Sequence, residues 1–184
     1  MKFDLAGIKL SKKDAKRDLK FPSEMNEKIA EDVGIMIGDG CIGVYKNGRF
    51  TNNFISVDGN SITDKEYLIG YVSKLKFELY NLNFSPLFKK NRNELRIDLN
   101  SQGLLQFYTK IIGLPSGKKI NVGIPSCIWE NEEFVKSCLR GIVDTDGSFQ
   151  VRTGNYPQIK IGVSSKKLIG DCKKAFGILG IETS

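Results

Sequence analysis

The sequence predicts an α+β protein built from two tandem copies of one unit, in which helices alternate with antiparallel β-hairpins. Helical and hairpin patterns alternate along the 184 residues. The segment GIMIGDG at residues 34–40 returns as GIVDTDG at residues 141–147, 107 residues later. A second match follows in the same order, because LIG at residues 68–70 returns at residues 168–170. Two matches in equivalent elements indicate a duplication.

The first copy has the pattern helix, hairpin, helix, hairpin, helix. Residues 23–38 place apolar side chains at helical spacing after Ser23, which we expect to cap the helix, and the glycines at 38–40 end it. Asn47-Gly48 is the turn signal of the first hairpin. The next elements are a helix over 63–82 capped by Thr63, a hairpin over 85–100, and a helix over 101–112.

A linker rich in glycine, proline and serine separates the two copies. The second copy predicts a helix over 130–144, a hairpin whose strands flank residues 153–155, and a helix over 165–180 capped by Ser164 or Ser165. It is shorter than the first copy, so we expect an incomplete, truncated second unit. The expected boundaries are a basic N-terminal arm at 1–22, the first unit at 23–114, the linker at 115–129 and the second unit at 130–184.

The composition excludes several classes of catalytic site. The chain has 28 Lys and Arg against 21 Asp and Glu, a formal net charge of +7, and no histidine. Ser-His-Asp and Cys-His nucleophiles, His-ligated zinc and nucleases with an imidazole base are therefore excluded. The four cysteines lack C-x-x-C spacing, which favours reduced thiols over a zinc ribbon or a redox motif. Catalysis is left to carboxylates, lysines, hydroxyls and oxygen-ligated metal, and the basic charge suggests a polyanionic partner.

No apolar run approaches the roughly 18 residues of a membrane span. The basic N-terminus is also not followed by an apolar stretch of the kind found in a signal peptide. We expect a protein without a membrane partner, located in the cytoplasm and associated with the nucleoid.

Each copy of the repeated motif ends an apolar helix with two small residues four positions apart, which form a flat stripe on one helix face. Two such stripes allow two helix backbones to pack closely. This packing would bring Asp39 and Asp146 together at the helix C-termini, where the negative end of each dipole disfavours a carboxylate unless a cation is present. A hard divalent cation, Mg²⁺ first, fits such oxygen ligands best. The stripes are Gly34 with Gly38 and Gly141 with Thr145.

An Asp-Gly pair also commonly ends a helix and starts a strand without any further role. A single copy would favour that interpretation. Two copies at symmetric positions in a basic protein, each followed by a hairpin, favour a functional pair of carboxylates.

The sequence resembles the monomeric two-motif LAGLIDADG homing endonucleases. Residues 139–147 (LRGIVDTDG) follow the family signature closely and depart from it mainly at Arg140 and Thr145. Residues 32–40 (DVGIMIGDG) are a looser form, with an apolar residue in place of the earlier acid. The resemblance covers residues 23–184.

This resemblance implies a DNA-binding saddle of two αββαββα units related by a pseudo-twofold axis. It implies metal-dependent double-strand cleavage of a long asymmetric target in double-stranded DNA, as part of intron or intein homing. The chain would act as a monomer that forms a pseudo-dimer, with Mg²⁺ or Mn²⁺ as cofactor.

In this family the second acid of each motif binds the metal, which carries over to Asp39 and Asp146 as the catalytic acids. The residues that precede them, Gly38 and Thr145, complete the predicted metal site. Family members often place a lysine near each metal, and the neighbouring lysines of the linker, Lys118 and Lys119, are the nearest candidates. We select Lys119 as the third catalytic residue, although an ordinary solvated linker is the alternative for both lysines.

Strand alternation nominates DNA-facing side chains independently of the family. If the apolar residues of the later strands face the core, the polar residues between them face outward and can reach bases and phosphates. A merely solvated sheet face is the alternative. The expected core residues are Leu95, Ile97, Phe149, Val151, Ile159, Ile161 and Val163. The expected DNA-binding residues are Arg96, Ser148, Gln150, Arg152, Gln158 and Lys160, with Lys46, Arg49 and Asn52 from the less regular first hairpin.

Two other functions remain open at this stage. One is a catalytically silent nucleic-acid binder, such as an RNA-splicing maturase or a transcription regulator. The other is a purely structural repeat protein, which the basic charge and the paired motifs disfavour. Retention of both acids favours the enzyme, because a binder has no need to keep an unfavourable carboxylate pair.

Overall fold

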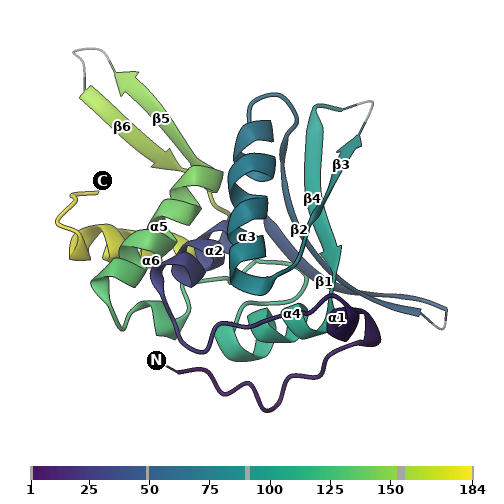
Figure 1. Cartoon of the computed structure of the whole chain (residues 1–184). Coiled ribbons are helices and arrows are strands. Elements are labelled where there is room, and N and C mark those ends of the chain that lie inside the picture. Colours follow the sequence, from purple (N-terminus) through teal and green to yellow (C-terminus); the bar gives the residue numbers. More distant parts are fainter. Residues whose placement is uncertain (1, 49, 90–91, 153–155, 184) are drawn as a thin grey trace.

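A computed structural model of the chain describes residues 2–48, 50–89, 92–152 and 156–183. Two antiparallel sheets lie on either side of a central group of helices (Figure 1). The first unit contains the helices α2 (Glu27–Ile37), α3 (Ser73–Tyr80) and α4 (Gln102–Gln106), with α3 preceded by the π-helix η1 (Glu66–Val72) and α4 followed by the π-helix η2 (Phe107–Ile112). Its sheet has the order β1-β2-β4-β3, with β1 Gly40–Asn47, β2 Phe50–Asn60, β3 Ser85–Lys89 and β4 Glu94–Asn100.

The second unit repeats the beginning of the first. It contains α5 (Glu132–Asp146), the hairpin β5 (Gly147–Arg152) and β6 (Tyr156–Ile161), and α6 (Lys166–Ile178), preceded by the 3-10 turn η3 (Ser126–Ile128). The order of helices and hairpins predicted from the sequence is confirmed. No helix within the described residues is long and apolar enough to cross a membrane.

Three predicted helix ends were wrong. Asn26, and not Ser23, caps α2, because its side chain accepts a hydrogen bond from the Ile29 N–H. Thr63 does not cap the second helix; its hydroxyl donates to Asp64 instead. The motif helix of the second unit runs on to Asp146 and does not end at Asp144. Ser165 does cap α6, as one of the two alternatives predicted.

The N-terminal segment lies along α4 and η2 (Figure 1). The short helix α1 (Lys12–Lys16) begins with a capping box between Ser11 and Asp14. The buried Asp14 carboxylate also accepts a hydrogen bond from the Gly103 N–H at the start of α4. The basic residues expected in the arm are therefore presented from a segment that is anchored to the first unit.

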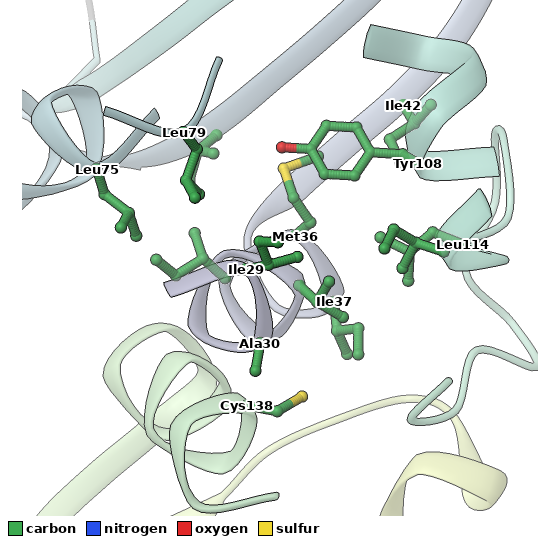
Figure 2. Packing of buried hydrophobic residues seen from close by; sticks show 14 of the residues in the cluster. Ile29, Ala30, Met36, Ile37, Ile42, Leu75, Leu79, Tyr108, Leu114 and Cys138 are labelled. Carbon is green, nitrogen blue, oxygen red and sulfur yellow. The ribbon is translucent and has the colours of Figure 1, made fainter. Parts of the chain in front are cut away.

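The two motif helices, α2 and α5, are in direct backbone contact. A β-carbon added to Gly34 would lie 2.1 Å from the Cys138 carbonyl oxygen, and one added to Gly141 would lie 2.4 Å from the Glu31 carbonyl oxygen. Only glycine permits this approach at these positions, so the predicted packing of the small-residue stripes is confirmed. Figure 2 shows Ala30 on the same side of α2, facing Cys138.

The other side of α2 packs into the core of the first unit, where Figure 2 shows Met36 beside the Tyr108 ring. A polar cluster lies within this core. The fully buried Lys76 ammonium donates to Asp32 at 2.6 Å, and the hydroxyls of Tyr80 and Tyr108 donate to the same carboxylate at 2.8 and 2.6 Å. Lys76 also donates to the Tyr108 hydroxyl at 3.1 Å. Every charge in the cluster therefore has a partner, as burial requires.

The hairpin of the second unit does not bury its apolar face as expected. Leu95 and Ile97 are buried in the first sheet, but Phe149, Val151 and Ile159 are 67%, 60% and 52% exposed. In the first unit, α4 and η2 cover the corresponding face. Within the described residues the second unit contains no such pair, so the expectation of a buried face at these three residues was wrong.

Candidate functional site

The two motif acids lie where the C-termini of α2 and α5 meet. Asp39 follows the end of α2 by two residues, and Asp146 is the last residue of α5. A β-carbon built on Gly38 would lie 1.9 Å from the Thr145 hydroxyl oxygen and 3.3 Å from Asp146 Oδ2. The helix pair therefore brings the two acids together from opposite ends of the sequence.

Burial raises the pKa of Asp39 to about 6, and the charge of Asp146 contributes in the same direction. Burial also raises the pKa of Asp146, while the nearby Lys119 ammonium opposes the change for both acids. The last carbonyls of both helices point to the same region, so their dipoles add further negative potential. The site therefore has an excess of negative charge and favours a cation.

Lys119 lies at the end of α2. Its ammonium donates to the carbonyl oxygens of Ile37 at 2.9 Å and of Gly38. Burial lowers the pKa of Lys119, although the charges of Asp146 and Asp39 oppose that change. The neighbouring Lys118 is exposed. The two lysines that the sequence left as alternatives thus differ in position, and Lys119 is the one beside the acids.

The raised pKa of Asp39 predicts that the carboxylate destabilises the metal-free protein as the pH rises. The folded state holds the proton more tightly than the unfolded state, so the stabilisation present below about pH 4 is lost as the pH rises through about 6. We expect Asp39→Asn to be more stable than the wild type by about 1–2 kcal/mol at pH 7.5, with little difference at pH 4. Urea unfolding in EDTA at several pH values measures this difference, and a constant difference across the range would contradict it.

The donor set fits Mg²⁺ or Mn²⁺ better than a cation that needs a complete protein cage. No group of three or more acidic, histidine or cysteine ligands occurs among the described residues. Mg²⁺ is commonly held by one or two carboxylates together with substrate phosphates and water, and Asp39 and Asp146 supply that number. The Thr145 hydroxyl donates to the Gly141 and Ile142 carbonyls, and the Gly38 carbonyl accepts from Lys119. These two predicted metal-site residues are thus adjacent to the acids but already engaged.

The outer face of the first sheet contains Asn52 and Arg96, as predicted. Alternation along β1 places Tyr45, and not Lys46, on that face, because Tyr45 pairs with Asn52 whereas Lys46 shares its side of the strand with the buried Ile42. No local signal in the sequence predicts this register. Arg49, also predicted to bind DNA, lies outside the described residues.

On the hairpin of the second unit, alternation places the predicted residues on the face opposite Phe149. Ser148 pairs with Lys160 and Gln150 pairs with Gln158. Ser148, Gln150 and Lys160 are exposed, whereas Gln158 is half-buried. The backbone of Arg152 continues this row opposite Tyr156, but its side chain lies outside the described part of the chain.

The sequence interpretation missed several residues beside the predicted ones. Asp58 pairs with Arg96 across β2 and β4, and its carboxylate accepts from Arg96 Nε at 2.5 Å. Arg17, from the end of α1, donates to the Asn100 carbonyl at 3.0 Å and so reaches the same sheet. These contacts join segments far apart in the sequence, and strand alternation alone carries no signal for them.

Comparison with known proteins identifies the second half of this arrangement. Residues 133–184 match the family model of the LAGLIDADG-like domain. Solved structures of the homing endonuclease I-DmoI share the fold of most of the chain. Its complex with DNA and Ca has a TM-score of 0.64 at 16% identity, over 86% of this chain and 74% of that chain.

The chain carries a LAGLIDADG-like domain and has the LAGLIDADG fold. Mesophilic variants of I-DmoI give a TM-score of 0.62 at 16% identity, over 86% of this LAGLIDADG-like chain and 79% of theirs. A component of the A-type ATP synthase of Pyrococcus abyssi is 25% identical over 184 aligned residues. That match covers 89% of this chain and 16% of the ATP synthase component, so the chain spans about a sixth of this relative's length.

Proposed function

We propose that this protein is a site-specific DNA endonuclease that depends on Mg²⁺ or Mn²⁺ and makes double-strand cuts in a long asymmetric target. In this proposal it serves intron or intein homing inside the cell, and one chain acts as a pseudo-dimer. The observation that carries the proposal is the meeting of Asp39 and Asp146 at the ends of α2 and α5, beside Lys119. I-DmoI, which shares the fold, has been solved in complex with DNA and Ca and with DNA and Mn.

The residues of the site divide the work by charge. Asp39 and Asp146 supply carboxylate oxygens that face each other, one for each strand of the duplex. A bound divalent cation supplies Lewis acidity and lowers the pKa of water at the scissile phosphate. Lys119 holds a positive charge beside both acids, where it stabilises negative charge that develops on a phosphate during hydrolysis.

The competing proposal of a catalytically silent nucleic-acid binder accounts less well for the acids. Asp39 is partly buried, with a pKa of about 6, and lies beside the charge of Asp146. A carboxylate pair in this position opposes folding and repels DNA phosphates when no cation is bound. A protein that only binds DNA or RNA gains nothing from keeping it.

Cleavage of a plasmid library with long random inserts tests the proposal. The wild-type protein is incubated with Mg²⁺, with Mn²⁺ and with Ca²⁺, and new ends are captured and sequenced. We expect double-strand ends at one recurrent sequence in Mg²⁺ or Mn²⁺ and none in EDTA. Recurrent binding without ends in either metal would support the silent binder. The mass of the protein–DNA complex, with one chain expected per target, tests the pseudo-dimer.

Lys119 and Lys118 provide a matched pair for the role of the buried lysine. We expect Lys119→Met to reduce cleavage by roughly 100-fold, because a charge aimed at the developing negative charge is removed. Lys118→Met removes an identical charge from an exposed neighbouring position and should change the rate by less than about threefold. Single-turnover cleavage rates, with binding measured separately in Ca²⁺, distinguish the two variants. Equal losses in both would contradict the catalytic assignment of Lys119.

A further inference from the structure

The outer face of the first sheet contains a groove of about 590 Å³. Its lining combines hydrogen-bond donors with one acid and an aromatic ring, and includes Arg17, Asn52, Phe54, Arg96, Asp98 and Asn100. We propose that this groove recognises a guanine in the major groove of the target through Arg96, and the paired cytosine through Asp98. The inference rests on the proposed function and assigns base specificity to the half-site on the Asp39 side.

Arg96 is held in place before any DNA binds. Its Nε donates to Asp58 at 2.5 Å, and its guanidinium carbon lies 5.4 Å from the centre of the Phe54 ring. The next acid, Glu94, is 4.0 Å from one terminal amino group. The two terminal amino groups therefore remain available as parallel donors, on a side chain that is already partly ordered.

The amide network at the other end of the groove also presents donors. The Asn53 N–H donates to Asn100 Oδ1, which directs Asn100 Nδ2 toward Asn52 Oδ1 at 3.0 Å. Asn52 Oδ1 is thus an acceptor that already has a partner, and its amino group is the exposed end. Arg17 adds a second guanidinium, held by the Asn100 carbonyl.

Guanine is the base that matches this arrangement. In the major groove it offers two acceptors, O6 and N7, whereas adenine offers one acceptor beside a donor, and cytosine offers a donor. Asp98 lies two residues after Arg96 on the same face of β4, and an ionised carboxylate there is the acceptor that the cytosine amino group requires. A phosphate would also attract Arg96, but Asp98 and Asp58 beside it make the groove unfavourable for a phosphate.

The base preference is measured first with the wild-type protein. Targets selected in Ca²⁺ are re-synthesised with each of the four bases at every position of both half-sites. We expect one position on the Asp39 side to favour guanine by roughly 10- to 100-fold in Kd. Replacing that guanine with 7-deazaguanine, which lacks the N7 acceptor, should weaken wild-type binding by about fivefold or more.

Arg96→Lys assigns the preference to one side chain. Lysine keeps the charge beside Asp58 but loses the paired terminal donors. We expect this variant to bind the four bases at that position within about threefold of one another, to be insensitive to 7-deazaguanine, and to keep its preferences in the other half-site. Lys28→Met, which removes a lysine paired with Glu78 between α2 and α3, is the control and should keep the wild-type profile.

Two results would overturn the inference while leaving the endonuclease in place. One is a cleaved target in which no position altered by Arg96→Lys prefers guanine in the wild type. The other is an equal loss of affinity for all four bases in the variant, which would assign Arg96 to a phosphate. Failure of the wild type to select any DNA would instead overturn the proposed function, and the inference with it.

Discussion

Asp146→Asn abolishes double-strand cleavage, with an expected reduction of about 1000-fold or more on the strand that it serves. Asparagine keeps the shape of the side chain at the end of α5 but removes the negative charge that attracts a cation. Asp39→Asn should have the same effect on the other strand. Quantifying nicked and linear plasmid in single-turnover reactions with Mg²⁺ measures both strands separately.

DNA binding in Ca²⁺-free buffer is the control for these variants. Both asparagine variants should bind at least as tightly as the wild type, because each removes one negative charge that faces the phosphates. Asp144→Asn offers a second control, since Asp144 is exposed and pairs with Arg140 at 3.6 Å on the surface of α5. If Asp146→Asn linearised the plasmid at the wild-type rate, Asp146 would not be a catalytic acid.

Gly141→Ala disrupts the contact between α2 and α5. The added methyl group would lie 2.4 Å from the Glu31 carbonyl oxygen and 2.7 Å from the Ile35 nitrogen, both backbone atoms that cannot move independently. We expect a loss of about 3 kcal/mol in the free energy of unfolding, because the helices must separate to accommodate it. Urea unfolding followed by far-UV circular dichroism measures the loss.

Gly170→Ala is the matched control for this substitution. Gly170 lies inside α6, and a β-carbon there meets no described atom within 4 Å. The same change from glycine to alanine should therefore stabilise the protein by up to about 1 kcal/mol through helix propensity. Opposite signs in the two variants attribute the loss at Gly141 to packing. A loss of similar size at both positions would mean that the close contact of the motif helices contributes little.

The sequence was sufficient for the order of the elements and for the pairing of the motif helices. Glycine stripes, apolar periodicity and Asp-Gly pairs are local signals, and their repetition fixes which helices correspond. The position of Asp39 near Asp146 follows from that correspondence alone.

Features that depend on distant segments were not predictable in the same way. Ser23 looked like the helix cap, but its carbonyl accepts from the Phe3 N–H in the N-terminal segment, and Asn26 caps α2 instead. Lys76 looked like a solvated helical lysine, and nothing local pairs it with Asp32, 44 residues away. The exposure of Phe149 depends on which helices cover a sheet face, and strand alternation does not contain that information.

The buried cluster of Asp32, Lys76, Tyr80 and Tyr108 restricts how related sequences can diverge. Loss of either charge alone leaves the other enclosed without a counterion, which is strongly destabilising, whereas apolar side chains at both positions can be tolerated. Substitutions at Asp32 and Lys76 should therefore appear together or not at all among descendants of this protein. Because Asp32 lies in the same helix that leads to Asp39, the inheritance of a residue in α3 is tied to that of the motif.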